Sequence, residues 1–331
     1  MKKILLLGAG RIGQVHARNV VARNDARLYA VVDVHRPAAA ALAEATGARV
    51  FDSADAALAD PDVDAVMICT STDTHVEMIL KAAKANKPIF CEKPVDLDLA
   101  KVNTCLAEVG RAGVPLLMGF NRRFDPTFKA LRDRIKQGEL GELESIKITS
   151  RDPEPPPPAY VKVSGGLFRD MMIHDLDMAR YLLPEEPTQV FATGSVLIDK
   201  AIGEAGDIDT AMVILKTPSG RLAHIDNSRR AAFGYDQRIE AFGQKGMLQA
   251  NNPTPTAVVS TTNTGRHSDK PLHFFLERYA AAYQAELAHF LAVLDGEERP
   301  LVTGEDGRRA LVLADAANQS LRSGRVVEVQ P

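Results

Sequence analysis

The sequence has no tryptophan, few aromatic residues and no excess of either charge. Aromatic residues make up 5% of the 331 positions, which leaves too few for a base-stacking surface. The formal net charge is −3, so there is no basic field to attract nucleic acid or an anionic membrane. We therefore expect neither nucleic acid nor membrane as a partner.

Cysteine and long apolar runs are also scarce. Cys69, Cys91 and Cys105 stand singly, with no Cys-x-x-Cys pair and no even-numbered framework, so we expect a reducing compartment. The amino-terminal apolar run, Ile4–Leu7, is too short for a signal-peptide core, and no run approaches membrane-spanning length. Together these absences predict a soluble, cytoplasmic protein.

The apolar fraction of 45% and the charged fraction of 25% are typical of globular proteins, and the length favours two domains. The first third alternates short apolar runs with amphipathic, alanine-rich stretches, which predicts a parallel sheet covered by helices on both faces. The expected strands are 4–7, 28–32, 65–69, 89–91 and 115–118, and the expected helices are 14–24, 37–46, 75–85 and 98–112.

The pattern changes near residue 120, where strand-like segments begin to follow one another without long helices between them. The expected strands here are 143–151, 189–199, 208–216, 221–228 and 236–243, with helices at 125–137, 167–183, 275–296 and 304–322. The proline-rich stretch 153–158 is expected to be a stiff extended loop. We therefore predict an α/β domain at 1–120 and an α+β domain with a mainly antiparallel open sheet at 121–331.

A glycine motif lies between the first expected strand and helix. The segment reads Gly8-Ala9-Gly10-Arg11-Ile12-Gly13, which matches G-x-G-x-x-G. Gly8 permits a tight turn, Gly10 lets the backbone approach a pyrophosphate, and Gly13 lets the helix pack against the strand. An incidental glycine turn is the alternative, but the preceding strand and following helix favour a dinucleotide-binding (Rossmann) domain.

Asp33 ends the next expected strand, where a carboxylate can accept hydrogen bonds from the adenosine ribose of NAD. Its charge would repel the 2′-phosphate of NADP. Arg36 stands close by and can offset part of that repulsion, so the sequence favours NAD and leaves NADP open.

Two further segments follow expected strands, at the carboxyl edge where such sheets bind ligands. The first contains Thr70, Ser71 and His75, and the second is Glu92-Lys93-Pro94. A Glu-Lys-Pro tripeptide alone is a common turn, so its position at this edge is what favours a functional interpretation.

The second domain contains Asp170 and His174, four residues apart and therefore on one face if the segment is a continuous helix. An alcohol dehydrogenase must remove the hydroxyl proton as hydride leaves carbon, and histidine suits this task because its usual pKa is near neutral pH. Asp170 can hold the charged ring, and Lys93 can stabilise a developing alkoxide. The alternatives are a surface ion pair or a metal site including Asp175 and Asp177, but no third ligand stands at a familiar spacing.

At these residues the sequence resembles the glucose–fructose oxidoreductase/inositol dehydrogenase (Gfo/Idh/MocA) family, and within it most strongly the inositol branch. The shared segments extend over almost the whole chain. They are the glycine loop with His16, the Thr72/His75 loop, Glu92-Lys93-Pro94, 119–126, 165–180 and 234–238. The segments 119–126 and 165–180 are the more characteristic of the inositol branch.

The resemblance implies roles for individual residues. Lys93, Asp170 and His174 would be the catalytic trio, and Arg123, Asp152 and Tyr235 would line the polyol pocket together with them. The nicotinamide and its ribose would lie near Thr70, Ser71, His75, Glu92 and Lys93. The resemblance also implies a metal-independent enzyme that forms a homotetramer through the open face of the second-domain sheet.

The leading hypothesis is oxidation of myo-inositol at its axial hydroxyl to 2-keto-myo-inositol, with hydride passing to NAD. A second hypothesis is the same reaction on another inositol isomer or on an aldose such as glucose. A third is a non-catalytic NAD-binding regulator, although such a protein would have no need of Lys93, Asp170 and His174 together.

Overall fold

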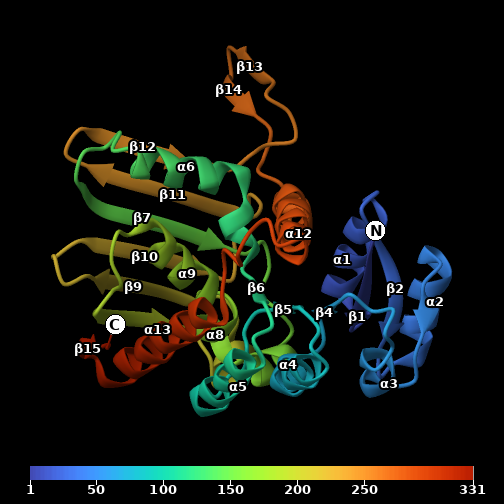
Figure 1. Cartoon of the computed structure of the whole chain (residues 1–331). Helices are drawn as coiled ribbons and strands as arrows, with labels where there is room; N and C mark the ends of the chain where they lie inside the picture. Colours follow the sequence, from blue (N-terminus) through green and yellow to red (C-terminus); the bar gives the residue numbers. More distant parts are fainter. Residues whose placement is uncertain (331) are drawn as a thin grey trace. The chain divides into compact units, whose positions relative to one another are not determined.

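The computed structural model describes residues 1–330, which pack as two compact units. Unit 1 comprises Met1–Phe124 and Ala282–Leu311, whereas unit 2 comprises Asp125–Ala281 and the described chain from Val312 onward. The elements of both units are labelled in Figure 1. The predicted boundary at residue 120 assigned all later residues to the second domain, whereas residues 282–311 belong to unit 1.

Unit 1 is built on a six-stranded sheet in the order β3-β2-β1-β4-β5-β6, with all neighbours parallel. Its strands are β1 (Lys2–Leu7), β2 (Ala26–Val32), β3 (Arg49–Val50), β4 (Ala65–Ile68), β5 (Ile89–Glu92) and β6 (Leu116–Gly119). Every residue of β4, β5 and β6 is buried, as expected for a sheet covered on both faces. The predicted α/β domain with a parallel sheet is confirmed. The strand order reverses between β1 and β4, the place where such sheets bind ligands.

Helices α1 (Arg11–Val21), α2 (Arg36–Thr46), α3 (Ala54–Leu58), α4 (His75–Lys84) and α5 (Leu99–Ala112) alternate with these strands, as do the short helices η1 (Thr72–Thr74) and η2 (Asn121–Phe124). Two further helices come from the far end of the sequence: α12 (Ala280–Leu294) and the first part of α13 (Gly304–Ser323). Within unit 1, the α12 residue Phe290 lies 5.9 Å from Phe90, centroid to centroid, and Tyr283 lies 5.6 Å from His16. The returning helix therefore completes the core beside β5 and α1.

Unit 2 contains a seven-stranded sheet in the order β12-β11-β7-β10-β9-β8-β15. Its strands are β7 (Leu143–Arg151), β8 (Gln189–Ser195), β9 (Thr210–Lys216), β10 (Leu222–Ser228), β11 (Asp236–Gly243), β12 (Gly246–Ala250) and β15 (Val327–Glu328). The pair β7–β10 is parallel, whereas the other neighbours are antiparallel. This confirms the predicted mainly antiparallel sheet.

The remaining elements of unit 2 are α6 (Pro126–Lys136), α7 (Pro158–Ser164), α8 (Gly166–Asp170), α9 (Ile173–Leu182), α10 (Lys200–Glu204), α11 (Phe275–Arg278) and the hairpin of β13 (Val259–Thr262) and β14 (Gly265–Ser268). The prediction of one helix over 167–183 is wrong, because α8 ends at Asp170 and α9 begins at Ile173. The helical hydrogen-bond pattern is interrupted here, because the Met172 N–H donates to the Leu167 carbonyl and the His174 N–H donates to the Met171 carbonyl instead of to partners four residues back. The chain turns between the two helices instead.

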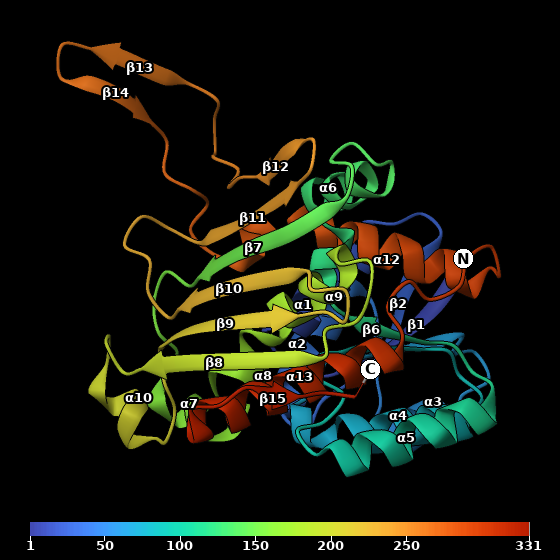
Figure 2. The same cartoon turned by 90° about the vertical axis from the view of Figure 1, so that its left-hand side faces the viewer.

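One face of the unit 2 sheet is not covered by helices, and Figure 2 looks onto it. The strand registers place six half-exposed apolar side chains on this face: Phe191, Met212, Ile214, Leu222, Phe242 and Met247. We call these six residues the open-face cluster. In the described part of the chain, no helix is both long and apolar enough to cross a membrane.

Candidate active site

The glycine loop lies between β1 and α1, at the carboxyl edge of the unit 1 sheet. Gly8 has φ +97°, and a Cβ there would lie 2.4 Å from the Cys69 carbonyl oxygen. A Cβ on Gly13 would lie 2.0 Å from the Gly8 carbonyl oxygen. A Cβ on Gly10 would meet no atom within 4 Å. The fold itself therefore requires two of the glycines, whereas Gly10 keeps the space outside the loop clear.

Helix α1 begins directly after this space. Its N-cap is Gly10, which has no side chain to accept from the first-turn amides, and Arg11 and Ile12 are its first two residues. Uncapped N–H groups and the positive end of the helix dipole suit the pyrophosphate of a dinucleotide. The residues present thus fit the cofactor that the sequence predicts.

Asp33 follows β2 and is bound to the loop. Its Oδ2 accepts a hydrogen bond from the Ala9 N–H at 2.6 Å, and its Oδ1 accepts one from the His35 N–H at 2.7 Å. Each carboxylate oxygen has a second lone pair for a ribose hydroxyl. Arg36 is largely exposed and lies 2.7 Å from Asp52, so a carboxylate of the protein already offsets its charge.

Thr70 and Ser71 follow β4, on the other side of the point where the strand order reverses. His75 is 1% exposed, and its Nδ1 lies 2.7 Å from the carbonyl oxygen of Pro94 while its Nε2 lies 3.1 Å from that of Thr70. Burial lowers the pKa of His75 below the usual 6.5, against the opposing effect of the two carbonyls. The ring thus joins the Thr70 loop to the peptide after Lys93.

Glu92 ends β5 and is held inside unit 1. Its Oε1 lies 2.7 Å from Nε2 of His16 on α1, and a Cβ on Gly119 would lie 3.0 Å from its Oε2. Glu286 of α12 is fully buried, and burial together with the Glu92 charge raises its pKa well above the usual 4.5. Glu92 therefore connects α1, the helix after the glycine loop, to β5. The next residue, Lys93, is partly exposed and precedes a cis proline.

Asp170 and His174 lie on either side of the turn between α8 and α9. Asp170 is the last residue of α8, and its carboxylate accepts from the Tyr160 hydroxyl at 2.9 Å and from Arg229 Nη1 at 3.1 Å. His174 is the second residue of α9 and is partly exposed. The neighbouring acids point inward: Asp175 is fully buried and accepts from Asn227 at 2.9 Å, and Asp177 is 1% exposed.

Arg229 is a residue that the sequence interpretation missed. It is 3% exposed, and its Nη1 lies 3.1 Å from Asp170 and 3.7 Å from Asp152. Asp152 and Arg229 immediately follow β7 and β10, which run parallel with Arg151 opposite Ser228. In the sequence, Asp152 and Arg229 each directly follow an expected strand. This shared position shows that they are neighbours only when the parallel pairing of the two strands is known.

Two of the predicted substrate-binding residues are largely buried. Arg123 is 6% exposed and donates to Asp306 at 2.9 Å within unit 1. Tyr235 is 6% exposed in unit 2, where its ring lies 6.0 Å from that of Tyr279. Their contacts with a polyol stay predictions that rest on the family resemblance.

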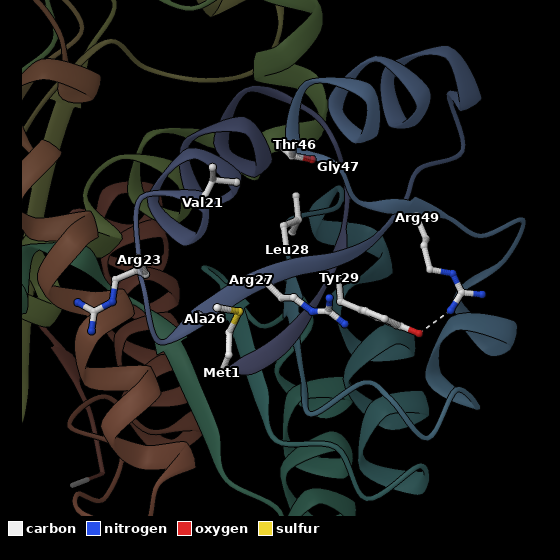
Figure 3. A pocket seen from close by; sticks show the side chains of 10 residues that line it. All are labelled: Met1, Val21, Arg23, Ala26, Arg27, Leu28, Tyr29, Thr46, Gly47 and Arg49. Carbon is white, nitrogen blue, oxygen red and sulfur yellow. Dashed lines mark hydrogen bonds between the residues drawn. The ribbon is translucent and has the colours of Figure 1, made fainter.

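A surface hollow of about 460 Å³ lies elsewhere on unit 1 (Figure 3). Its lining includes Met1, Ala26 and Arg27, which lie at or before the amino ends of β1 and β2. The glycine loop is at the opposite, carboxyl edge, so this hollow is not the dinucleotide site. Among residues 1–330, no group of three or more His, Cys, Asp or Glu side chains could hold a metal ion.

Two family models match the chain. One, described as the oxidoreductase family with an NAD-binding Rossmann fold, covers residues 2–120. The other, described as the GFO/IDH/MocA C-terminal domain, covers residues 128–249.

Curated relatives align over nearly the whole chain. An inositol 2-dehydrogenase of Rhizobium meliloti is 52% identical over 98% of both chains. A myo-inositol 2-dehydrogenase of Thermotoga maritima is 48% identical over 99% of this chain and 98% of its own. A scyllo-inositol 2-dehydrogenase (NAD⁺) of Bacillus subtilis is 36% identical over 98% of this chain and 95% of its own.

Solved structures agree with these relatives. The crystal structure of a putative myo-inositol dehydrogenase from Sinorhizobium meliloti superposes with a TM-score of 0.96, at 51% identity and full coverage of both chains. A scyllo-inositol dehydrogenase from Lactobacillus casei with bound NAD(H) and scyllo-inositol has a TM-score of 0.92, at 28% identity over 99% of both chains.

Proposed function

We propose that this chain oxidises myo-inositol to 2-keto-myo-inositol with NAD as hydride acceptor. The chain belongs to the GFO/IDH/MocA family of NAD-binding oxidoreductases. The observation that carries this proposal is the 52% identity to an inositol 2-dehydrogenase over 98% of both chains. The 36% identical scyllo-inositol 2-dehydrogenase makes another inositol isomer the second candidate substrate.

The proposed cofactor-binding residues lie along the carboxyl edge of the unit 1 sheet. The clear space beside Gly10 and the uncapped start of α1 accept the pyrophosphate, and Asp33 accepts from the ribose hydroxyls. Thr70, Ser71 and Lys93 lie at the ends of β4 and β5 and bind the nicotinamide half. His75 and Glu92 are buried, and they support this edge as positioning residues.

The chemical roles fall to three side chains. NAD, when bound, supplies the acceptor for the hydride. His174 accepts the proton of the reacting hydroxyl, since a neutral imidazole is a competent base near neutral pH. Lys93 supplies positive charge where the alkoxide develops. Asp170 is held by Tyr160 and Arg229, and this fixed carboxylate positions and stabilises the protonated His174 ring.

Arg123, Asp152 and Tyr235 complete the proposed polyol site. Asp152 shares the buried Arg229 cation with Asp170, so a change at either carboxylate alters the charge that the other faces. Selection among isomers depends on polar groups that the wrong stereoisomer leaves unpaired.

We test the proposal by initial rates of NADH formation with myo-, scyllo- and chiro-inositol and with glucose. Each substrate is assayed with NAD and with NADP. We expect the highest kcat/KM for myo-inositol with NAD. If no inositol isomer yields NADH or NADPH, the proposed activity is wrong; if scyllo-inositol exceeds myo-inositol, the second candidate replaces the first.

We also propose that the protein forms a homotetramer and that the open-face cluster contributes to the subunit contact. Six half-exposed apolar residues on one sheet face form a surface that water solvates poorly. Lys147 and Glu240 are opposite each other on the same face, so a second copy related by a two-fold axis can meet opposite charges.

A reducing, cytoplasmic location completes the proposal. Cys69, Cys91 and Cys105 are free and buried, and burial raises the pKa of all three thiols, that of Cys105 to about 12. Such buried thiols are unreactive, and cysteines without disulfides are typical of proteins in a reducing compartment.

A further inference from the structure

A hairpin arm projects from unit 2. We define the arm as residues 253–270, which include β13 and β14. Both strands stand clear of the seven-stranded sheet in the two views (Figures 1 and 2). Every residue from 253 to 270 is exposed. The hydrogen bonds that its side chains make, such as those of Thr256 with Asp269, stay within the arm.

An arm of this kind has little to stabilise it within its own subunit. Ordering each backbone residue costs about 1–2 kcal/mol, and this cost is normally offset by apolar burial. The arm buries no side chain, and an isolated two-stranded hairpin is at best marginally stable in water. The arm therefore gains little stability from its own subunit, and a contact with another molecule would stabilise its hairpin conformation.

The base of the arm is firmly attached. At one end the Asn252 side chain accepts from the Gln237 N–H at 2.7 Å and donates to Asp236 at 2.7 Å. At the other end the Leu272 carbonyl accepts from the Tyr235 N–H at 3.0 Å. Both ends are thus anchored at the start of β11, so the arm leaves the sheet from a fixed point.

The outer edges of the hairpin are suited to pairing. β13 and β14 form a sheet of two strands, so each has one edge that pairs with no other strand among the described residues. The strand Val259–Thr262 has no charge and no proline, the residues that usually protect an edge against pairing. Val258 and Val259 are 71% and 42% exposed beside it. Such an edge takes up a further strand by main-chain hydrogen bonds.

We propose that the arm binds a second copy of this chain, with an outer edge of its hairpin paired against the neighbouring subunit. This inference rests on the proposed self-association and not on the proposed activity. The arm has only three charged residues, Arg266, Asp269 and Lys270, so it offers no field for nucleic acid or a membrane. From residue 253 to the tip it can span at most about 35 Å, enough to cross a subunit interface that starts at the same sheet.

The register identifies a substitution that tests edge pairing alone. The two-residue loop closes at Thr262 and Gly265, so the Thr261 N–H points away from β14. Thr261→Pro removes this outward N–H and leaves the hairpin's own hydrogen bonds in place. Thr261→Val is the matched control, because it keeps the N–H and the branched side chain.

The experiment measures native mass by light scattering over a dilution series for the full-length wild type and both variants. We expect the dissociation constant of the assembly to rise about tenfold or more in Thr261→Pro, which corresponds to about 1.4 kcal/mol, and to be unchanged in Thr261→Val. A second measurement is amide hydrogen exchange over residues 256–270, where we expect protection in the assembled wild type that is lost on dilution.

The proposal is overturned if the arm amides of the assembled protein exchange as fast as those of an unstructured peptide, or if both variants assemble alike. A protein that is monomeric at every concentration overturns it as well. The mass and exchange data do not depend on the substrate, so failure of the proposed activity would be seen separately in the NADH assay.

Discussion

At the scale of single residues, Asp33 combines two tasks. Its carboxylate accepts hydrogen bonds from the main-chain N–H groups of Ala9 and His35, so it shapes the glycine loop as well as offering lone pairs to a ribose. A substitution of Asp33 would therefore disturb the loop together with cofactor selection. Arg36 is 74% exposed, so its replacement measures NADP preference with little structural disturbance.

His174→Ala is predicted to lower kcat by about 10²- to 10⁴-fold, the usual contribution of a general base. The dissociation constant for NAD, measured by titration of the cofactor-free full-length protein, should change less than about twofold, because the proposed cofactor contacts belong to unit 1. Added imidazole should restore part of the rate in the variant. His273→Ala, a change at an exposed histidine, is the control and should keep the wild-type kcat. Unchanged turnover in His174→Ala would remove this residue from the mechanism.

Glu286→Gln is predicted to change how stability depends on pH. The pKa of Glu286 in the folded protein is raised well above the usual 4.5, so the native state binds a proton that the unfolded state releases. Wild-type stability should therefore fall as pH rises above about 4.5 towards the raised pKa, by at most about 1.4 kcal/mol per pH unit for one proton. Gln has the shape of the protonated acid and cannot ionise, so this loss should be absent.

The measurement is the unfolding midpoint of both proteins between pH 5 and pH 8. The difference between variant and wild type should shift in favour of the variant as pH rises. Glu297→Gln, at an exposed site just beyond the end of α12, is the matched control and should follow the wild-type curve. Parallel curves for Glu286→Gln and wild type would contradict the prediction.

At the scale of elements, different glycines of the glycine loop serve the cofactor and the fold. Gly10→Ala should fold normally, because its Cβ would meet no protein atom, yet it should weaken NAD binding about tenfold or more by occupying the cofactor's space. Gly13→Ala should lower the unfolding temperature as well, since its Cβ would lie 2.0 Å from the Gly8 carbonyl oxygen.

NAD titration and thermal unfolding of both variants check these expectations. The control is Gly110→Ala on α5, where the added Cβ also meets nothing within 4 Å and Ala favours the helix. It should keep NAD affinity and the unfolding temperature. Equal NAD affinity in Gly10→Ala and Gly110→Ala would place the pyrophosphate elsewhere.

Much of this element-level structure could be predicted because it depends on neighbours in the sequence. Buried strands appear as short apolar runs, and the loop from Gly8 to Gly13 has its strand and helix directly beside it. The expected helix 98–112 likewise agrees with α5, which ends at Ala112 before Gly113 in the αL conformation.

The parts that could not be predicted depend on contacts between distant segments. No glycine or proline between Asp170 and Ile173 in the sequence indicates that the helix is interrupted there. The parallel pairing of β7 with β10 brings Asp152 to Arg229, and the second partner, Asp170, comes from α8. Local periodicity carries no information on which strands become neighbours.

At the scale of the whole molecule, self-association can be tested on the open-face cluster. Ile214→Lys is predicted to reduce the native mass from that of a tetramer, because it places a charge in the centre of the proposed contact. Ile214 is 45% exposed in the single chain, so the fold itself should lose little stability.

Light scattering over a dilution series measures this effect. The matched control is Val21→Lys on α1, a residue that is 50% exposed and lies outside the cluster, and it should leave the native mass unchanged. If Ile214→Lys also keeps the wild-type mass, the tetramer contact does not include the centre of this face.

The return of residues 282–311 to unit 1 has a consequence for the order in which the protein can be made. During translation the strands of the NAD-binding domain leave the ribosome early, but α12, which packs on Phe90 and His16, follows only after residues 125–281 of unit 2 have been synthesised. The apolar surface beside Phe90 and His16 therefore stays uncovered until α12 has been synthesised. A fragment cut at the end of residue 124 would keep that side exposed to solvent, and it should aggregate where the full chain folds.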